Sequence, residues 1–565
     1  MRGRLRRLMV WLLGSLIVLM CTGPAAETLP SAPQPRPASQ FLTQATFGPT
    51  PEEIERVEAI GTEAWIDEQL KLPLPPSHLQ WRQARGESHH ILHGFWQMAL
   101  SEPGQLRLRV SYALSQILVV SAADGCGMDL HEGMASYMDL LNTHAFGHYR
   151  DLLHAVATHP VMGCFLSHLR NRKEDPESGR VPDENFAREI MQLFTIGLHQ
   201  LNPDGTLQRD ARGQPIETYG PEDVAGLAKV FTGWSWDCPA YPSEECFQYW
   251  GTTRRPGPDP WARPMRPYLQ FHSTEEKRFL GRVIARQWTP DPQGDLDVAI
   301  DTLVKHPNTA PFVSKLLIQR MITSNPSPAY VERVARVFAQ TQGHLGATVR
   351  QMLLDPEARN APDNSTPGAI TERKVREPVL RLSSLLRAFH AQSTSGRWMI
   401  GNTRDASSGL NQAPFQAPSV FNFYRPGYRP NGSATAQLDM VAPELQIADE
   451  TSMAGQARFF ETLIWAGIGE HVAQPPGRLH PADVKLDYQR DPQATVLEAA
   501  RDVGSLVELI NQRLLQARMP PGLRHTIEQA VTAAAPTAQD PNDRLRRVWT
   551  ALLLTVMSPE FMVEP

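Results

Sequence analysis

Apolar residues recur at intervals of three and four over most of the chain, which is the spacing of one face of an α-helix. In residues 51–60, for example, Ile54, Val57 and Ile60 lie on one face, and Thr50 precedes them as an N-cap residue. The same periodicity predicts helices at 90–100, 104–121, 134–143, 148–157, 161–170, 184–198, 221–232, 296–305, 309–323, 328–340, 345–354, 375–391, 452–467, 494–516, 523–534 and 542–557.

Signals for β-strands are few and short. The sequence Asn-Pro-Asp-Gly at 202–205 predicts the turn of a hairpin, and aromatic runs at 247–250 and 268–272 indicate two more short strands. Proline makes up 49 of 565 residues, above the usual ~5%, so long irregular connections are expected between the helices. The predicted fold class is therefore mainly α: a large multi-helix assembly with small β-hairpin excursions and long Pro-rich loops.

The chain is predicted to consist of a leader, a linker and one large helical domain. Residues 1–26 have the layout of a signal peptide, with arginines but no acids at the start and then an apolar run shorter than the ~20 residues of a membrane span. Residues 27–40 form a Pro-rich linker, and residues 41–565 form the helical domain, with an irregular insertion at about 235–270. The protein is therefore expected to be exported, either periplasmic or secreted; an uncleaved N-terminal anchor is the alternative.

The charge balance argues against nucleic acid as a partner. The whole chain has a formal net charge of −5, and cleavage of the leader removes four arginines and no acid, which leaves the mature chain more acidic. Binding to a phosphate backbone needs a basic face instead. No apolar stretch after the leader reaches the ~18 residues of a membrane-spanning helix, so no membrane span is expected after signal cleavage.

Four cysteines remain after the leader, and an even number in an exported protein predicts two disulfides. Cys238 and Cys246 flank a short loop, and Cys126 and Cys164 bracket a predicted helical hairpin, so these two local pairs are favoured. The alternative is that one pair stays as buried thiols. No metal site is predicted, because the chain has no C-x2-C spacing of the kind found in zinc sites.

No common catalytic or cofactor motif occurs in the chain, so the sequence leaves any cofactor unknown. The most polar predicted helix, at 184–198, places Asn185 and Glu189 on one face with Arg188 beside them. Glu189 is a candidate general base or metal ligand, and Arg188 is a candidate holder of an anionic group. The alternative is that Glu189 pairs with an arginine of a neighbouring helix and only ties two helices together.

A second group of candidate catalytic residues lies in the segment FHSTEEKRFLG at 271–281. His272 is placed to act as an acid or base where a strand runs into a loop, and Lys277 lies close to it in sequence. The alternative is that Glu275 and Glu276 are ordinary surface charges. Together with the polar residues of the helix at 184–198, His272 and Lys277 form the candidate catalytic set.

The order and spread of several short motifs resemble the bacterial family catalogued as domain of unknown function 1800. The matching segments are FLTQATFGPT at 41–50, ENFAREIMQLFTIGL at 184–198, FTGW at 231–234, FHSTEEKRFLG at 271–281, HPNTAPFVSKLLIQR at 306–320, REPVLRL at 376–382, APSVFNFYRPGY at 417–428 and SPEFM at 558–562. Members of the family usually have an Asp directly after the His of the segment 271–281 and a Gly directly before its Lys. This chain has Ser273 and Glu276 at those two positions, which weakens a shared catalytic role for His272.

The resemblance implies a predominantly helical, exported bacterial protein with no established activity. Genes of the family often neighbour those of another exported family, domain of unknown function 1501, which is similar to sulfatases and alkaline phosphatases. The first functional hypothesis is therefore a helical binding or accessory protein for a co-exported sulfatase-like partner. The alternative is an extracytoplasmic hydrolase with a site around Asn185, Arg188, Glu189 and His272.

Overall fold

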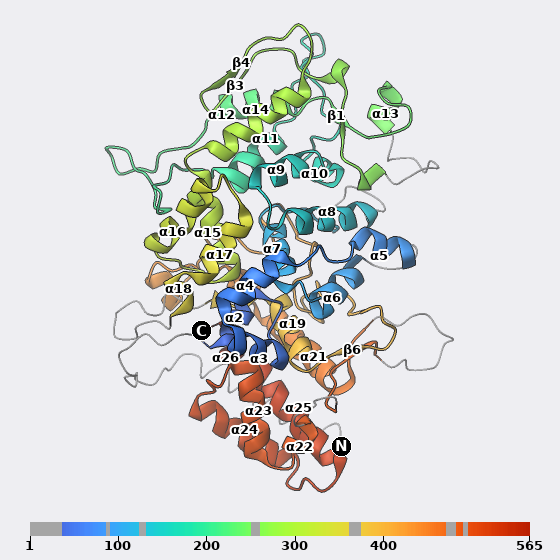
Figure 1. Cartoon of the computed structure of the whole chain (residues 1–565), viewed down its shortest axis with the longest axis vertical. Coiled ribbons are helices and arrows are strands. Elements are labelled where there is room, and N and C mark those ends of the chain that lie inside the picture. The colour runs from blue at the N-terminus through green and yellow to red at the C-terminus, as the bar shows by residue number, and fades with distance from the viewer. Residues whose placement is uncertain are drawn as a thin grey trace.

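The computed structural model describes residues 37–85, 91–123, 131–249, 260–360, 374–469, 482–489 and 495–564. The predicted leader and most of the linker lie outside these residues. The molecule is elongated, with helices α22 to α25 at one end and helices α12 and α14 with the β3–β4 hairpin at the opposite end (Figure 1). Within the described part of the chain, no helix is long and apolar enough to cross a membrane.

Helices dominate the described residues, as the periodicity predicts. The N-terminal helices are α2 (Ala38–Ala45), α3 (Pro51–Ile60), α4 (Thr62–Lys71), α5 (His78–Arg85), α6 (Ile91–Ser101), α7 (Gln105–Ser115), α8 (His131–His144), α9 (Tyr149–Ala157) and α10 (Pro160–Phe165). The central helices are α11 (Asn185–Glu189), α12 (Pro221–Val230), α13 (Glu244–Tyr249), α14 (Pro292–Lys305), α15 (Thr309–Met321), α16 (Pro328–Gln340), α17 (Leu345–Leu354), α18 (Pro356–Arg359) and α19 (Pro378–Ala388). The last helices are α20 (Ala434–Gln437), α21 (Glu450–Ala466), α22 (Val496–Ala499), α23 (Val503–Leu515), α24 (Pro521–Ala534), α25 (Pro541–Val556) and α26 (Pro559–Met562).

Many of the prolines start helices instead of interrupting the chain. Proline occupies the first turn of α3, α10, α12, α14, α16, α18, α19, α24, α25 and α26. This position suits proline because its missing N–H would have no partner within the helix. The high proline content therefore reflects helix starts as well as the irregular connections that the composition predicts.

The strands form four separate two-stranded antiparallel pairs. They are β1 (Trp234–Ser235) with β2 (Arg266–Pro267), β3 (Lys277–Phe279) with β4 (Arg282–Ile284), β5 (Lys374–Val375) with β8 (Val563–Glu564), and β6 (Gln392–Ser393) with β7 (Val484–Lys485). The β5–β8 pair brings the last described residues back beside the start of α19. The mainly α class with small β excursions is confirmed.

Two helices form the centre of the core. Every residue of α7 and every residue of α19 is buried, so both helices are surrounded by protein on all sides. Polar side chains on such helices must find partners inside the protein, because an unpaired buried polar group is costly. The interior around α7 and α19 is therefore the place where buried polar contacts have to be accounted for.

Three of the expected elements differ in the structure. The predicted helix at 104–121 ends at Ser115. The described part of the aromatic run at 247–250 lies in helix α13 and not in a strand, because Ser243 starts a helical turn by accepting a hydrogen bond from the backbone N–H of Cys246. The aromatic run at 268–272 forms a 3₁₀ turn at Leu269–Phe271. Short aromatic runs favour strands only where a neighbouring strand is available to pair with them.

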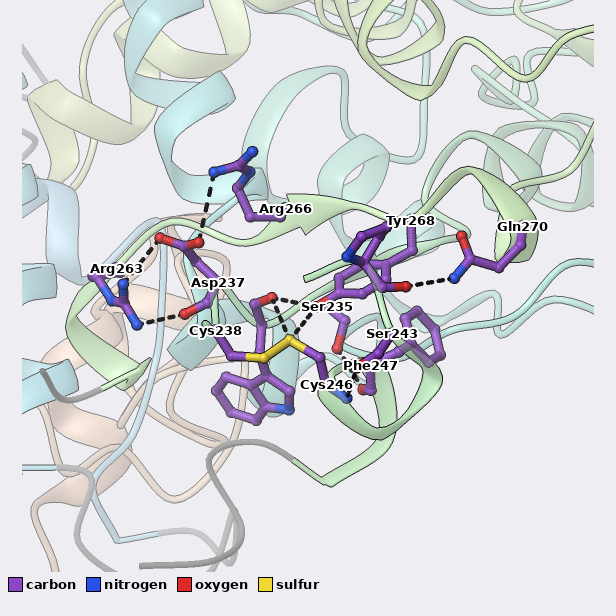
Figure 2. The surroundings of a disulfide bond; sticks show 12 residues. Ser235, Asp237, Cys238, Ser243, Cys246, Phe247, Arg263, Arg266, Tyr268 and Gln270 are labelled. Atoms are coloured by element: carbon purple, nitrogen blue, oxygen red, sulfur yellow. Dashed lines mark hydrogen bonds and ion pairs between the residues drawn. A yellow bond between two sulfur atoms is a disulfide. The ribbon is translucent and has the colours of Figure 1, made fainter. Parts of the chain in front are cut away.

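The insertion at about 235–270 is held together by a disulfide, by hydrogen bonds and by ion pairs (Figure 2). The predicted Cys238–Cys246 disulfide is present, with a Cα–Cα distance of 6.1 Å. The hydroxyl of Tyr268 donates to the backbone oxygen of Trp236 at 2.6 Å, and Asp237 forms ion pairs with two arginines of the insertion. Cys126 lies outside the described residues, so the pair Cys126–Cys164 stays a prediction.

Candidate functional site

The helix predicted at 184–198 begins as α11 and then widens into a π-helical stretch at Ile190–Thr195. The hydroxyl of Thr195 donates to the backbone oxygen of Ile190 at 2.6 Å, and the N–H groups of Ile196 and Gly197 both donate to the oxygen of Met191. Stretches of π-helix are rare and are frequent at functional sites. This one directly follows Glu189, one of the predicted site residues.

Of the three polar residues predicted on this helix, Glu189 alone is buried. Its side chain is 7% exposed, and no protein atom among the described residues donates a hydrogen bond to its Oε2. Asn185 and Arg188 lie at the surface instead: the Asn185 amide contacts the hydroxyl of Ser167, and Arg188 pairs with Glu184 at 3.2 Å. The expected tie between Glu189 and an arginine of a neighbouring helix is absent from the described residues.

Burial sets the protonation behaviour of Glu189. Desolvation raises the pKa of this carboxyl, and the positive charge of Arg188 lowers it only in part. Tyr219 lies close enough for the charge of Glu189, together with burial, to raise the pKa of its phenol. The Tyr219 hydroxyl donates to Oε1 of Gln192 at 3.3 Å. Glu189 is therefore a buried carboxyl near a neutral phenol, and groups with such perturbed pKa values are frequent at functional sites.

His272 and Lys277 belong to a second, separate cluster that is centred on Asp295. Nε2 of His272 lies 2.9 Å from Oδ2 of Asp295, and the Lys277 ammonium lies 2.8 Å from the same oxygen. The other carboxylate oxygen of Asp295 accepts a hydrogen bond from Gln287 at 2.7 Å. Asp295, on α14, was not predicted from the sequence, because nothing in its local pattern shows that it faces the segment 271–281.

This cluster is closed to solvent, and its polar groups are paired. His272 and Lys277 are both 0% exposed. Nδ1 of His272 contacts the backbone oxygen of Thr232 at 2.8 Å, and Lys277 also donates to the backbone oxygen of Ser273 at 2.7 Å. Burial alone would raise the pKa of Asp295, but the hydrogen bonds and charges of His272 and Lys277 outweigh it and lower that pKa.

The two predicted groups are not joined. Within the described part of the chain, no hydrogen bond or ion pair connects Glu189 to His272 or to Lys277. Ser273, where the family usually has aspartate, is also buried, and its hydroxyl donates to Glu174 at 2.8 Å. Glu275 and Glu276 pair with arginines at the surface.

A third polar centre, between α7 and α19, was missed by the sequence analysis. Glu377, the residue before α19, is fully buried, and its Oε2 accepts four hydrogen bonds. The donors are Tyr112 at 3.2 Å, Gln116 at 2.6 Å, Gln412 at 2.6 Å and Tyr424 at 2.8 Å. Burial and the charge of Glu377 raise the pKa of both phenols well above the ordinary value, so they stay neutral donors.

Charged residues surround Glu377, and we call the whole set the Glu377 cluster. Besides Glu377 it contains Arg109, Arg320, Lys374, Arg376, Arg381, Glu444 and Glu564. Each of these side chains is at most 5% exposed. Lys374 pairs with Glu444, and Arg376 lies 3.5 Å from Glu564. A charged residue inside an apolar helical run, such as Arg381 in PVLRLSSLL, is a sequence signal for a buried charge. The sequence does not show which residues contact that charge.

A metal centre finds no support in these clusters. Among the described residues, no group of three or more His, Cys, Asp or Glu side chains is arranged to hold a metal ion. A surface cavity of about 270 Å³ opens between α6 and the segment 401–416. It is lined by Leu92, His93, Trp96, Gly401, Asn402, Arg404 and Gln416. None of the residues singled out as catalytic from the sequence lines this cavity.

Comparison with known proteins places the chain in one family. The family model described as "Protein of unknown function (DUF1800)" matches residues 40–563, which is nearly the whole chain. No curated protein matches the chain, and no solved structure matches it. The expected resemblance is confirmed, and it brings no activity with it.

Proposed function

The chain belongs to the DUF1800 family, and from this premise we propose that it is an exported helical protein that binds a co-exported protein partner. The partner that the sequence analysis favours is the sulfatase-like protein of the neighbouring family. In this proposal the chain performs no hydrolysis itself. Its contribution is a rigid helical body that presents a contact surface.

The closed state of the Asp295 cluster speaks against a catalytic role for His272 and Lys277. A general acid or base must reach the proton that it transfers, directly or through one water molecule. Both side chains are 0% exposed, and their nitrogens contact Asp295, Thr232 and Ser273. This arrangement fits a buried tie between the segment 271–281 and helix α14.

The observation that carries the binding proposal is Trp288, in the connection between β4 and α14. The Trp288 side chain is fully exposed to solvent, so it contacts almost nothing in this chain. Val283, on β4, is also exposed. The elements that flank Trp288, β4 and α14, lie at one end of the molecule (Figure 1). Tryptophan is enriched at the centres of protein interfaces, where it contributes a large apolar area.

The test is to purify the tagged mature chain from the extracytoplasmic fraction of its own host and to identify bound proteins by mass spectrometry. We expect a near-stoichiometric sulfatase-like protein with the wild type and its loss with Trp288→Ser. The matched control is Leu74→Ser, because Leu74 is another exposed apolar residue and lies between α4 and α5, away from the hairpin. Equal recovery of the partner with both variants, or no partner with the wild type, would refute the proposal.

The second candidate function is a hydrolase centred on Glu189. The specific observation in its favour is the buried, unpaired carboxylate oxygen beside the π-helical stretch, together with the raised pKa of Glu189. A raised pKa suits a general acid near neutral pH. If the wild-type chain purifies alone, Glu189→Gln is the variant to assay, and loss of turnover without loss of folding would support this candidate.

A further inference from the structure

The Glu377 cluster contains more positive than negative groups. Its cationic side chains are Arg109, Arg320, Lys374, Arg376 and Arg381, and its carboxylates are Glu377, Glu444 and Glu564. A formal surplus of positive charge therefore lies in the interior around α7 and α19. Burial also raises the pKa of Glu564, which weakens the negative side further. A buried charge without a counter-charge is strongly destabilising, so this surplus needs a physical explanation.

Three guanidinium groups of the cluster, those of Arg109, Arg376 and Arg381, have N–H donors without a hydrogen-bond partner among the described residues. Arg376 and Arg381 flank the first turn of α19. Nε of Arg376 forms an ion pair with Oε1 of Glu564 at 3.5 Å, but its Nη1 makes no hydrogen bond to any described protein atom. Arg381 donates to the neutral amide of Gln456, and its Nε and Nη1 have no acceptor among the described residues. Arg381 therefore has no ion pair with any described carboxylate, and both guanidinium groups have an unused donor at Nη1.

The two guanidinium groups also act on each other. Burial and the positive charge of Arg376 together lower the pKa of Arg381 to about 9. Arg381 therefore remains charged at neutral pH and repels its neighbour. The positive end of the α19 dipole lies at the same first turn and adds to the positive potential.

We propose that a small inorganic anion, a halide or an oxyanion, is bound between Arg376 and Arg381 as a structural ligand. Water would satisfy the free N–H donors but would leave the charge surplus in place. An anion does both, because guanidinium groups form their strongest hydrogen bonds with negatively charged acceptors. The site is sealed by protein, so the anion enters during folding and is retained afterwards. This ligand site is independent of the proposed partner binding.

The first experiment measures the anion directly. The purified full-length protein is desalted exhaustively into a buffer free of halide, phosphate and sulfate, denatured, and analysed by ion chromatography. We expect about one anion per chain from the wild type, and the identity of the ion distinguishes a halide from an oxyanion. Release of no anion from correctly folded wild-type protein would overturn the proposal, and this result does not depend on any variant.

Two arginine variants locate the site. Arg381→Met removes an unpaired guanidinium, whereas Arg387→Met removes an equally buried one on the same helix that is already paired with Glu53 at 2.6 Å. We expect R381M to release no anion and R387M to release the same amount as the wild type. An unchanged anion content in R381M would overturn the location. Crystals of protein folded in bromide give an independent readout. A peak of anomalous difference density in contact with both arginine side chains supports the site. A water molecule at that position, without an anomalous peak, refutes a halide.

Discussion

Replacement of Asp295 by asparagine is expected to destabilise the protein strongly, because it leaves the Lys277 ammonium buried without a carboxylate. The lysine nitrogen lies 2.8 Å from the Asp295 oxygen and is 0% exposed. Removing one partner of a buried ion pair typically costs about 3–5 kcal/mol. The lysine can instead lose its proton, which from an ordinary pKa of ~10.4 costs about 5 kcal/mol at pH 7. Both routes give an expected loss of about 3–5 kcal/mol in the free energy of unfolding.

The dependence of this loss on pH follows from the same reasoning. In the variant, the buried Lys277 ammonium has no carboxylate beside it, so its charged form is disfavoured in the folded state. The unfolded chain then binds more protons, and the stability of the variant rises with pH. At pH 9 the cost of deprotonating the lysine falls to about 2 kcal/mol. The defect of Asp295→Asn is therefore expected to be smaller at pH 9 than at pH 7.

Urea unfolding followed by tryptophan fluorescence at the two pH values is the assay. The matched control is Asp301→Asn, on the same helix, because Asp301 pairs with Arg150 and Lys305 near the surface and such pairs contribute at most about 1 kcal/mol. A loss below about 1 kcal/mol for Asp295→Asn at pH 7, or a defect that grows at pH 9, would refute the structural interpretation of the cluster. A catalytic cluster would show the opposite pattern, with stability kept and activity lost.

Two further predictions concern other parts of the chain. Glu189→Gln is expected to raise the melting temperature at pH 7, because burial raises the pKa of Glu189 and the charged form is penalised in the folded state. This gain in melting temperature is present above the folded-state pKa of Glu189 and disappears as the pH falls below the ordinary glutamate pKa of ~4.3. Glu184→Gln, at the surface of the same segment, serves as the control. A lowered melting temperature for E189Q would contradict the reasoning. Replacing both Cys238 and Cys246 by serine is expected to cost about 2–3 kcal/mol in urea unfolding, from the short loop that the disulfide closes, and a loss below about 1 kcal/mol would count against it.

The local elements were largely predictable, and the reason is that their signals are short in sequence. Thr50 is the N-cap of α3 as expected, and Glu53 completes a capping box with it. The turn at 202–205 closes an irregular two-stranded ribbon. The Cys238–Cys246 pair follows from its short separation. The predictions that failed were also local: the described part of the aromatic run at 247–250 is helical, because a helix start at Ser243 outweighs the β-propensity of the aromatic residues.

The candidate site was predictable only in part. The sequence singled out Glu189, His272 and Lys277, and the structure places all three in the interior. The sequence did not indicate that His272 and Lys277 both contact Asp295, which lies on α14. It also gave no reason to separate these two residues from Glu189, because adjacency in space depends on how α11, α12 and α14 pack.

The sequence by itself therefore determined the helical class, most helix positions, their proline and side-chain caps, and the local disulfide. Each of these depends on residues within a few positions of one another, where backbone geometry and hydrophobic spacing decide the outcome. Only the tertiary structure decided which charges are buried and what they meet. Glu377 receives hydrogen bonds from Tyr112 and Tyr424, which are far away along the chain. The free energy of a charged group depends on everything packed around it, and that environment exists only once the distant segments have come together.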